Sequence, residues 1–182
     1  MRIISGSHKG KIIKINKFFT ARPTTDFAKE NLFNIISNFE NFDFEKSKVL
    51  DLFAGSGSIS YEFASRNCKN ITSVELKLRH FLLIKKNIKD FNFKSINLMR
   101  KNFFSFCNNC KEDFDLIFAD PPYDFESVEK VPGLIFEKKI LRENGTFILE
   151  HSSKINFSKN KFFIQKRKYG YINFSFFQNK KP

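Results

Sequence analysis

Long apolar runs are missing from this sequence of 182 residues. The longest ones, such as 81–84 and 114–119, fall well short of the roughly 20 apolar residues that a membrane span requires. The first residues also lack the apolar segment and the small-residue cleavage site of a signal peptide. These absences argue against a membrane protein and against an exported one. We therefore expect a soluble cytoplasmic protein.

Cysteine is scarce as well, with three copies at Cys68, Cys107 and Cys110. An odd number of cysteines in a chain without an export signal argues against a disulfide framework. Cys107 and Cys110 have the C-x-x-C spacing of a metal knuckle or a redox pair. A structural zinc site needs four ligands, however, and no second pair accompanies these two. We expect no metal site and regard the cysteines as structural or incidental.

Acidic residues are in deficit, because 32 Lys and Arg face 19 Asp and Glu and give a formal net charge of +13. Such a surplus favours a polyanionic partner such as nucleic acid. Glycine is also rare, with 7 copies, whereas Lys, Asn, Ile and the 26 Phe are abundant. AU-rich codons produce this composition without selection for any partner. The charge therefore supports a nucleic-acid partner without establishing one.

The apolar pattern alternates between strand-like and helix-like segments from residue 26 onward. Strand-like runs lie at 48–54, 70–75, 96–99, 114–119 and 145–150, and helix-like stretches lie at 26–39, 58–66, 78–91 and 126–141. Such alternation predicts parallel βαβ units in an α/β fold, and the length suits one domain. Thr25 or Asp26 is placed to cap the first helix.

The two ends of the chain depart from this alternation. Short β-like runs at 2–5 and 11–15 predict an N-terminal hairpin. Near the end, β-like runs at 161–168 and 171–177 are separated only by Tyr169-Gly170, a connection so short that it joins only antiparallel strands. We predict an α/β sheet finished by an antiparallel pair.

A glycine-containing loop follows the first of the parallel strands, at Asp51-Leu52-Phe53-Ala54-Gly55-Ser56-Gly57. Glycines there let the backbone approach a ligand, and ligands of open α/β sheets bind beyond the carboxyl ends of the strands. Glu75 ends the second strand, near the spacing of about 20 residues at which an acidic side chain takes a ribose hydroxyl pair. The alternative is that Asp51 only caps a turn and that Glu75 is a surface acid.

Two classes of nucleotide cofactor compete for this loop. A dinucleotide fingerprint needs a third glycine where Ser60 stands, and the charge of Asp51 would repel a pyrophosphate. S-adenosylmethionine has no phosphate and carries a cationic ammonium group that a carboxylate attracts. The carboxylates therefore favour S-adenosylmethionine.

A second motif, Asp120-Pro121-Pro122-Tyr123, follows the fourth strand. An amine conjugated with a ring is a poor nucleophile because its lone pair is delocalised. If the Asp120 carboxylate and the Pro121 carbonyl accept its N–H bonds, the nitrogen can pyramidalise and direct the lone pair at a sulfonium methyl group. Tyr123 supplies a stacking face for a base swung out of its stack. The competing interpretation is an ordinary strand-ending turn.

Taken together, these motifs resemble the RsmD family, small bacterial proteins that methylate the N2 atom of a guanine in 16S ribosomal RNA. The resemblance rests on Met1-Arg2-Ile3-Ile4, Lys9-Gly10-Lys11, Arg22-Pro23-Thr24-Thr25-Asp26, Leu32-Phe33-Asn34, the loop 51–57, the motif 120–123 and Tyr169-Gly170. It implies a Rossmann-like seven-stranded class I methyltransferase sheet with an antiparallel last strand. It also implies one domain, 1–182, with a basic hairpin and loop at 1–25 and a catalytic core at 26–182.

The resemblance assigns roles to particular residues. The catalytic set would be Asp120, Pro121, Pro122 and Tyr123. S-adenosyl-L-methionine would be held by Asp51, Phe53, Ala54, Gly55, Gly57, Glu75, Asn102 and Phe103. A basic face beside the cofactor mouth would bind RNA through Arg2, Lys9, Lys11, Lys14, Arg22 and Thr24. The expected partner is 16S rRNA within the small ribosomal subunit or its assembly intermediate, bound by a monomer.

Three positions depart from the family pattern. Asn102 stands where relatives usually carry an aspartate, although an amide can still form hydrogen bonds. Ser5 replaces a small glycine or alanine. Lys9 replaces an arginine, which keeps the charge and loses bidentate phosphate binding.

Other functions remain open at this point. A DNA or other RNA adenine or cytosine amino-methyltransferase shares the chemistry, but a DNA enzyme normally needs additional sequence to read a duplex. A glutamine methyltransferase of proteins usually has Asn at the place of Asp120. A non-catalytic RNA-binding assembly factor would keep the fold without turnover. His8, His80 and His151 are not expected to be catalytic, because methyl transfer from a sulfonium needs little general base.

Overall fold

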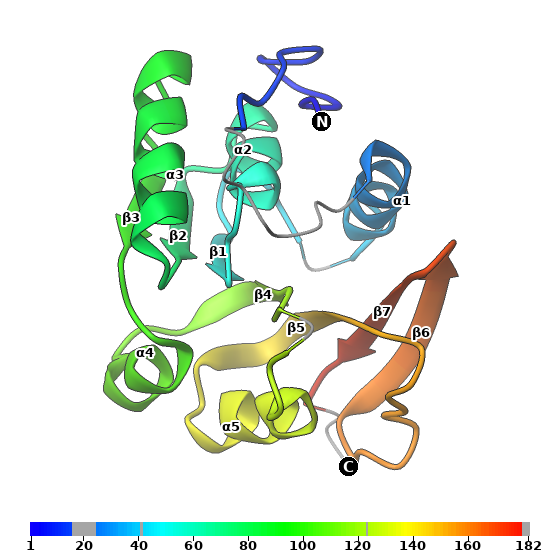
Figure 1. Ribbon diagram of the computed structural model, residues 1–182. Helices are drawn as coiled ribbons and strands as arrows, with labels where there is room; N and C mark the ends of the chain where they lie inside the picture. Colours follow the sequence, from blue (N-terminus) through cyan, green and yellow to red (C-terminus); the bar gives the residue numbers. More distant parts are fainter. Residues whose placement is uncertain (16–24, 41, 123, 180–182) are drawn as a thin grey trace.

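Strands and helices alternate along most of the chain and build one mixed sheet, as the computed structural model shows (Figure 1). The structure describes residues 1–15, 25–40, 42–122 and 124–179. The strands are β1 (Lys48–Leu52), β2 (Asn70–Val74), β3 (Ile96–Met99), β4 (Phe114–Ala119), β5 (Leu141–His151), β6 (Phe163–Tyr169) and β7 (Ile172–Phe177). The 7-stranded sheet has the order β3-β2-β1-β4-β5-β7-β6, in which β7 pairs antiparallel with both neighbours. The predicted sheet with its antiparallel last strand is confirmed.

The order of the strands reverses between β1 and β4. From β1 the chain moves outward through β2 to β3, and it then returns to the other side of β1 to form β4. Loops that leave β1 and β4 therefore diverge to opposite faces of the sheet and leave a crevice at the carboxyl ends of the strands. Such a switch point is the usual ligand site of open α/β sheets.

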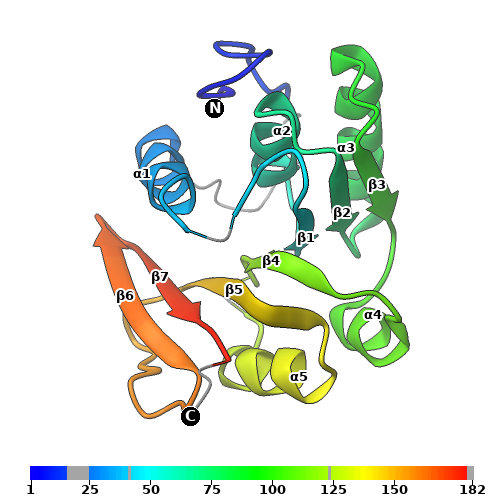
Figure 2. The ribbon, with the colours of Figure 1, turned by 180° about the vertical axis from the view of Figure 1, so that it is seen from behind.

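Helices cover both faces of the sheet (Figures 1 and 2). One face carries α1 (Asp26–Ile36), α2 (Ser58–Ser65) and α3 (Leu78–Phe91), and the other carries α4 (Phe103–Asn109), the short 3-10 turn Val128–Lys130 and α5 (Val131–Glu137). Successive side chains of a strand point to opposite faces. Accordingly, Val49 and Phe118 join the core beneath α1 and α2, whereas Leu50 and Ile117 join the core beneath α4 and α5. Burial on both faces explains the nearly continuous apolar runs of the central strands.

The N-terminal segment is less regular than predicted. In place of two strands, it contains a single antiparallel bridge between Arg2 and Ile12, supported by a hydrogen bond of 3.0 Å from Ile3 N to Lys11 O. The segment packs against the end of α2, where Ser7 N donates to Ser65 O at 2.7 Å. Its backbone bonds therefore go partly to a helix end instead of to a second strand.

Two helices differ from the expectation. The stretch predicted as helical over 126–141, apart from a disturbance at Pro132-Gly133, contains the 3-10 turn and the seven-residue α5, and residue 141 already belongs to β5. Pro132 stands in the first turn of α5, where proline is tolerated because the first backbone N–H groups lack partners in any case. Helix α4 was not predicted. It begins after Asn102, whose side chain caps it by accepting from Phe104 N at 2.9 Å.

Candidate active site

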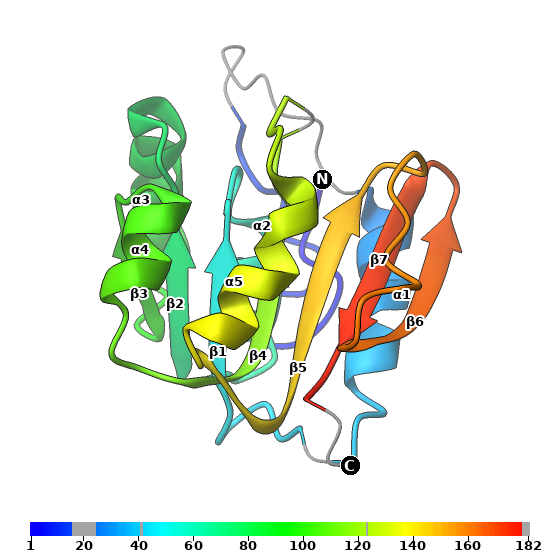
Figure 3. The ribbon, with the colours of Figure 1, turned by 90° about the horizontal axis from the view of Figure 1, so that it is seen from below.

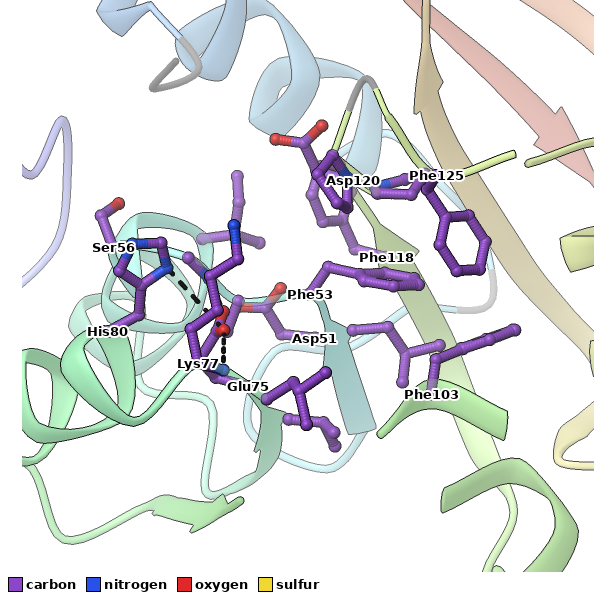
Figure 4. A pocket seen from close by; sticks show the side chains of 18 of the residues that line it. Asp51, Phe53, Ser56, Glu75, Lys77, His80, Phe103, Phe118, Asp120 and Phe125 are labelled. Atoms are coloured by element: carbon purple, nitrogen blue, oxygen red, sulfur yellow. Dashed lines mark hydrogen bonds and ion pairs between the residues drawn. The ribbon is translucent and has the colours of Figure 1, made fainter. Parts of the chain in front are cut away.

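A cavity of about 560 Å³ opens at the switch point, beyond the ends of β1, β2 and β4 (Figure 4). Its size lies in the range of small-molecule and cofactor sites. Ten of the residues predicted from the sequence line it, namely Asp51, Phe53, Ala54, Gly55, Glu75, Asn102, Phe103, Asp120, Pro121 and Pro122. The loops after four different strands thus converge on one cavity.

The glycine loop has its shape because of one position above all. Gly57 has φ of 81°, in the left-handed region, and a Cβ placed there would lie 2.4 Å from the ring of Tyr61. Gly57 is not among the residues that line the cavity. Its N–H closes the turn by donating to Ala54 O at 2.7 Å. The predicted cofactor contact of Gly57 stays a prediction, and the structure gives this glycine a role in shaping the loop.

Asp51 combines two roles that the sequence left as alternatives. It is 1% exposed, and its Oδ2 accepts hydrogen bonds from Ser60 N at 3.1 Å and Ser60 Oγ at 2.6 Å. The carboxylate therefore caps the first turn of α2 while it also lines the cavity. Burial raises the pKa of Asp51 to about 7, the Ser60 bonds oppose this rise, and the charge of Glu75 adds to it.

Glu75 is not a surface acid, since it is 6% exposed. Its Oε2 accepts from Gly55 N at 2.8 Å and its Oε1 accepts from Lys77 N at 2.7 Å. Figure 4 shows the third contact, to His80, whose Nδ1 lies 3.7 Å from Oε1. Burial lowers the pKa of His80, although the Glu75 charge opposes this effect. Glu75 thereby fixes the glycine loop to the end of β2 and retains further acceptor capacity at the cavity.

Aromatic rings form the wall opposite Glu75 (Figure 4). The rings of Phe53 and Phe103 stack with centroids 5.1 Å apart, and Phe125 lies 5.2 Å from Phe53 in an edge-on arrangement. Sequence reasoning found Phe53 and Phe103 and missed Phe125, together with the lining residues Ser56, Lys77, His80, Lys101 and Phe118. Ser56 belongs to the predicted glycine loop but had no assigned role; the other positions belong to no motif, so only the fold brings them together.

Asp120 lies at the end of β4, and its backbone N–H donates to Leu52 O at 3.4 Å. Burial of the carboxyl group raises its pKa well above the usual range, and the like charges of Glu150 and Asp51 raise it further. Pro121 is buried behind it, and Pro122 is exposed. The fourth residue of the motif, Tyr123, lies outside the described residues.

The donor set of the cavity suits a cationic ligand with an apolar part. Asp51, Glu75 and Asp120 supply three carboxyl groups that are at least partly buried, whereas the lining acid Asp124 and the lining cations Lys77 and Lys101 are exposed to solvent. The raised pKa of Asp51 means that its negative charge lacks compensation in the cavity. A positive group would supply that compensation, and a pyrophosphate would worsen the repulsion. The residues therefore fit S-adenosylmethionine better than a dinucleotide.

The basic residues predicted to bind RNA are spread along the N-terminal segment. Arg2 is next to the cavity rim, because the neighbouring Met1 Sδ lies 3.7 Å from Oγ of the lining residue Ser56. Lys9 follows His8, which contacts the far end of α3 through Phe91 O at 2.9 Å. Arg2 thus lies close to the mouth, and Lys9 lies about 12 Å away along an eight-residue helix, while the RNA contact predicted for each stays a prediction.

Lys11 and Lys14 also belong to the part of the N-terminal segment that packs alongside α3. Lys11 Nζ lies 5.7 Å from the centre of the Phe91 ring, and Lys14 O accepts from Asn87 Nδ2 at 3.1 Å. Both side chains are exposed. Arg22 and Thr24 lie outside the described residues. The RNA contacts of all these residues stay predictions.

Other functional groups are sparse. Cys68 and Cys107 are buried, and burial raises the pKa of the Cys107 thiol to about 12, so that it is not a reactive thiolate. Within the described residues, no group of three or more His, Cys, Asp or Glu is arranged to hold a metal ion. Over the same ranges, none of the helices has the length and apolar character to cross a membrane.

The strand order, the antiparallel β7 and the carboxylate-rich cavity at the switch point together define a class I methyltransferase. A family model described as Conserved hypothetical protein 95 matches residues 1–178. Ribosomal RNA small subunit methyltransferase D of Buchnera aphidicola is 35% identical over 153 residues, 84% of this chain and 78% of that protein. The protein of the same name from Haemophilus influenzae is 30% identical over 186 residues, 98% of this chain and 94% of its own length. The chain belongs to this family of methyltransferases.

A solved structure agrees with these sequence relatives. The crystal structure of a putative methylase from Haemophilus influenzae superposes with a TM-score of 0.78 at 27% identity, over 99% of this chain and 98% of that one. The agreement includes the N-terminal segment as well as the sheet, because nearly the whole of both chains is covered. The family expected from the sequence motifs is thereby confirmed.

Proposed function

We propose that this chain transfers a methyl group from S-adenosylmethionine to the exocyclic N2 atom of a guanine in 16S ribosomal RNA. The observation that carries the proposal is the placement of Asp120 and Pro121 at the rim of a cavity whose other walls hold Asp51 and Glu75. An acceptor for amine N–H bonds and a site for a cationic cofactor thus lie side by side. The relatives named ribosomal RNA small subunit methyltransferase D support rRNA as the substrate.

The cofactor would be held at three points of the cavity. Asp51 would attract the ammonium group, Glu75 would accept hydrogen bonds from the ribose hydroxyls, and Phe103 would flank the adenine. Asn102 already uses its side-chain oxygen to cap α4, so its amide N–H₂ is the part that can donate to a ligand. When bound, S-adenosylmethionine supplies a methyl group on a positively charged sulfur.

The chain's own contribution to the chemistry is to orient the amine. The Asp120 carboxylate and the Pro121 carbonyl would accept the two N–H bonds of the guanine amino group, which directs its lone pair into the cavity. Pro121 has a restricted φ, so its carbonyl needs little reorganisation. An ionised Asp120 accepts such a bond more strongly than a protonated one, so its raised pKa makes the rate sensitive to pH.

Three competing functions are outcomes of one experiment. Purified small ribosomal subunits that lack the modification are incubated with tritiated S-adenosylmethionine, and the labelled nucleosides or amino acids are identified. Label in N2-methylguanosine supports the proposal, label in an adenine, a cytosine or a protein glutamine refutes the guanine assignment, and RNA binding without label indicates an assembly factor. Asp120→Asn should lose at least a hundredfold in kcat, in line with the loss of a positioned electrostatic group. Asp90→Asn, far from the cavity at the end of α3, is the matched control.

The pH dependence gives a second readout of the same role. Because a protonated Asp120 is a weaker acceptor for the amine N–H bond than the carboxylate is, the rate should rise with pH through the raised pKa of Asp120 and then level off. Glu150→Gln removes a like charge that raises this pKa, so the rising limb should move to lower pH. A rate that does not rise with pH in the parent protein, or a rising limb that Glu150→Gln leaves in place, would contradict the role of Asp120.

A further inference from the structure

A group of exposed aromatic and basic side chains lies near the carboxyl ends of the parallel strands, on the far side of β5 from the cofactor cavity. Phe27, in the first turn of α1, is 64% exposed, and Tyr171, in the turn between β6 and β7, is 81% exposed. The ring of Phe27 lies 6.2 Å from that of Tyr169, nearly perpendicular to it. We call Phe27, Tyr169 and Tyr171, with Arg167 and Lys168 of β6, the turn patch.

The fold does not require these rings to be exposed. Leu32 and Phe33 of the same helix face the core and are fully buried, whereas Phe27 lies on the outer side of α1, where a polar residue would fit equally well. The turn itself is set by Gly170, which has φ of 61° at the first central position of a two-residue hairpin turn. Any polar residue could occupy position 171 without affecting that geometry. Exposed large rings of this kind mark interaction sites.

The turn patch and the reaction site both lie at the carboxyl ends of the parallel strands. Extending the β4–β5 register by one residue sets Asp120 beside Glu150, which pairs with Phe174 of β7. Tyr171 is three residues further toward the carboxyl ends of the parallel strands. Neighbouring strands lie about 4.8 Å apart and each residue advances about 3.3 Å, so the Cα atoms of Asp120 and Tyr171 are about 14 Å apart. Figure 3 shows the β6–β7 turn at the edge where β5 ends.

The charge around the rings selects the kind of partner. Arg167 and Lys168 are exposed, and residues 163–177, which form the whole hairpin, include no acidic residue. Rings beside cations bind single-stranded nucleic acid, whose bases stack on the rings while its phosphates meet the positive charge. A second copy of this chain, with the same net charge of +13, would be repelled.

We propose that the turn patch binds unpaired nucleotides of the substrate RNA that flank the target base, with bases stacked on Tyr171 and on Phe27. The identity of that RNA rests on the proposed function. A separation of about 14 Å corresponds to about four stacked nucleotide steps of 3.4 Å, so the base on Tyr171 lies within about four nucleotides of the target. Arg2 lies beside the turn patch, because its Nε is 3.7 Å from the carboxylate of Asp26, the neighbour of Phe27.

The first experiment compares variants in methyl transfer to unmodified small ribosomal subunits. Tyr171→Ala and Phe27→Ala should each raise KM for the subunits about tenfold, because a base–aromatic stack contributes on that scale, while kcat and the Kd of S-adenosylmethionine stay unchanged. Tyr171→Phe keeps a ring and should keep KM. Arg167→Ala should lower the salt dependence of binding by about one ion per complex. Leu82→Ala, at a side chain of α3 that is 52% exposed, is the matched control.

The second experiment identifies the partner directly and does not depend on turnover. Tyr171 is replaced by a photoreactive benzophenone side chain, with Leu82 replaced in the same way as control, and each protein is irradiated with the subunits. Crosslinks to 16S rRNA from position 171 support the proposal. Crosslinks to a ribosomal protein, to a second copy of this chain, or no more than the control gives would overturn it. If the parent protein forms no N2-methylguanosine but position 171 crosslinks to rRNA, the proposed chemistry fails and the turn patch stands.

Discussion

Replacing Asp51 by Asn should make the ligand-free protein more stable at neutral and alkaline pH. The pKa of Asp51 is about 7 in the folded protein, mainly because of burial, whereas an unfolded Asp has a pKa near 3.9. Between these two values the folded chain keeps a proton that the unfolded chain releases. The free energy of unfolding therefore falls as pH rises from about 4 to about 7 and then levels off.

The size of this effect follows from the two pKa values. At 1.36 kcal/mol per pKa unit, a folded pKa of about 7 corresponds to at most about 4 kcal/mol of destabilisation above pH 7. Asp51→Asn stays neutral in both states, and its amide oxygen can still accept the hydrogen bonds of Ser60. The variant should match the parent near pH 4 and exceed it by about 2 to 4 kcal/mol at pH 8.

Urea unfolding of both proteins at pH 4, 6 and 8 measures this difference, and calorimetry with S-adenosylmethionine measures its cost to binding. Cofactor affinity should fall about ten- to hundredfold in Asp51→Asn, because a hydrogen bond to a charged group is lost. Ser60→Ala is a matched variant that removes the 2.6 Å bond and keeps the carboxylate. Because that bond lowers the pKa of Asp51, the stability of the variant should go on falling to a higher pH than that of the parent. If Asp51→Asn is no more stable than the parent at pH 8, or if the difference between them is independent of pH, then the uncompensated charge of Asp51 is not a property of this site.

Further substitutions test how side chains pack around the site and in the N-terminal half of the chain. Gly57→Ala should lower the free energy of unfolding by about 2 to 4 kcal/mol, because it combines a left-handed φ with a clash against Tyr61. Gly170→Ala has a similar φ in open space and should cost only about 1 kcal/mol, so equal losses of the two variants in urea unfolding would contradict the clash. Lys29→Met should cost about 3 kcal/mol because it removes one of the two cations beside the buried carboxylate of Glu62, the other being Arg66 at 3.0 Å, and leaves Arg2 O without its donor; a loss below 1 kcal/mol by the same measurement would show that Lys29 and Glu62 are not coupled.

The central sheet could be predicted because short, local stretches of the sequence determine its strands. Strands buried on both faces need apolar residues at every position, and each such run ends at a polar or glycine-rich turn, as 114–119 does before Asp120. Glu75 and Asp120 could be named for the same reason, since each is the polar residue that follows a strand, and Asp51 could be named because it is a carboxylate inside β1 next to the glycine loop. Parallel strands then place their carboxyl ends on one edge without further information.

Contacts between distant segments could not be predicted in this way. Lys29 resembles a surface residue of an amphipathic helix, yet it is fully buried, with its Nζ 2.6 Å from Arg2 O and 3.0 Å from Ser58 Oγ. The direction of the N-terminal segment, and with it the position of Lys9, depends on the bonds that the end of α2 offers at Ser65. Neither partner is visible in a local pattern.

The buried carboxylates Glu62 and Asp51 differ in whether a cation of the chain compensates their charge. Glu62 is fully buried, and it accepts from Ile4 N at 2.7 Å and Ser5 N at 3.0 Å while Lys29 Nζ lies 3.9 Å away, so its charge is compensated within the chain. Asp51 has only the neutral donors of Ser60, and its pKa is raised. A carboxylate that is compensated internally stabilises the fold at all times, whereas one that lacks a cation is stabilised only when a positive ligand arrives. The cost of leaving Asp51 uncompensated is therefore offset on binding, and the same residue that weakens the empty protein selects a cationic cofactor.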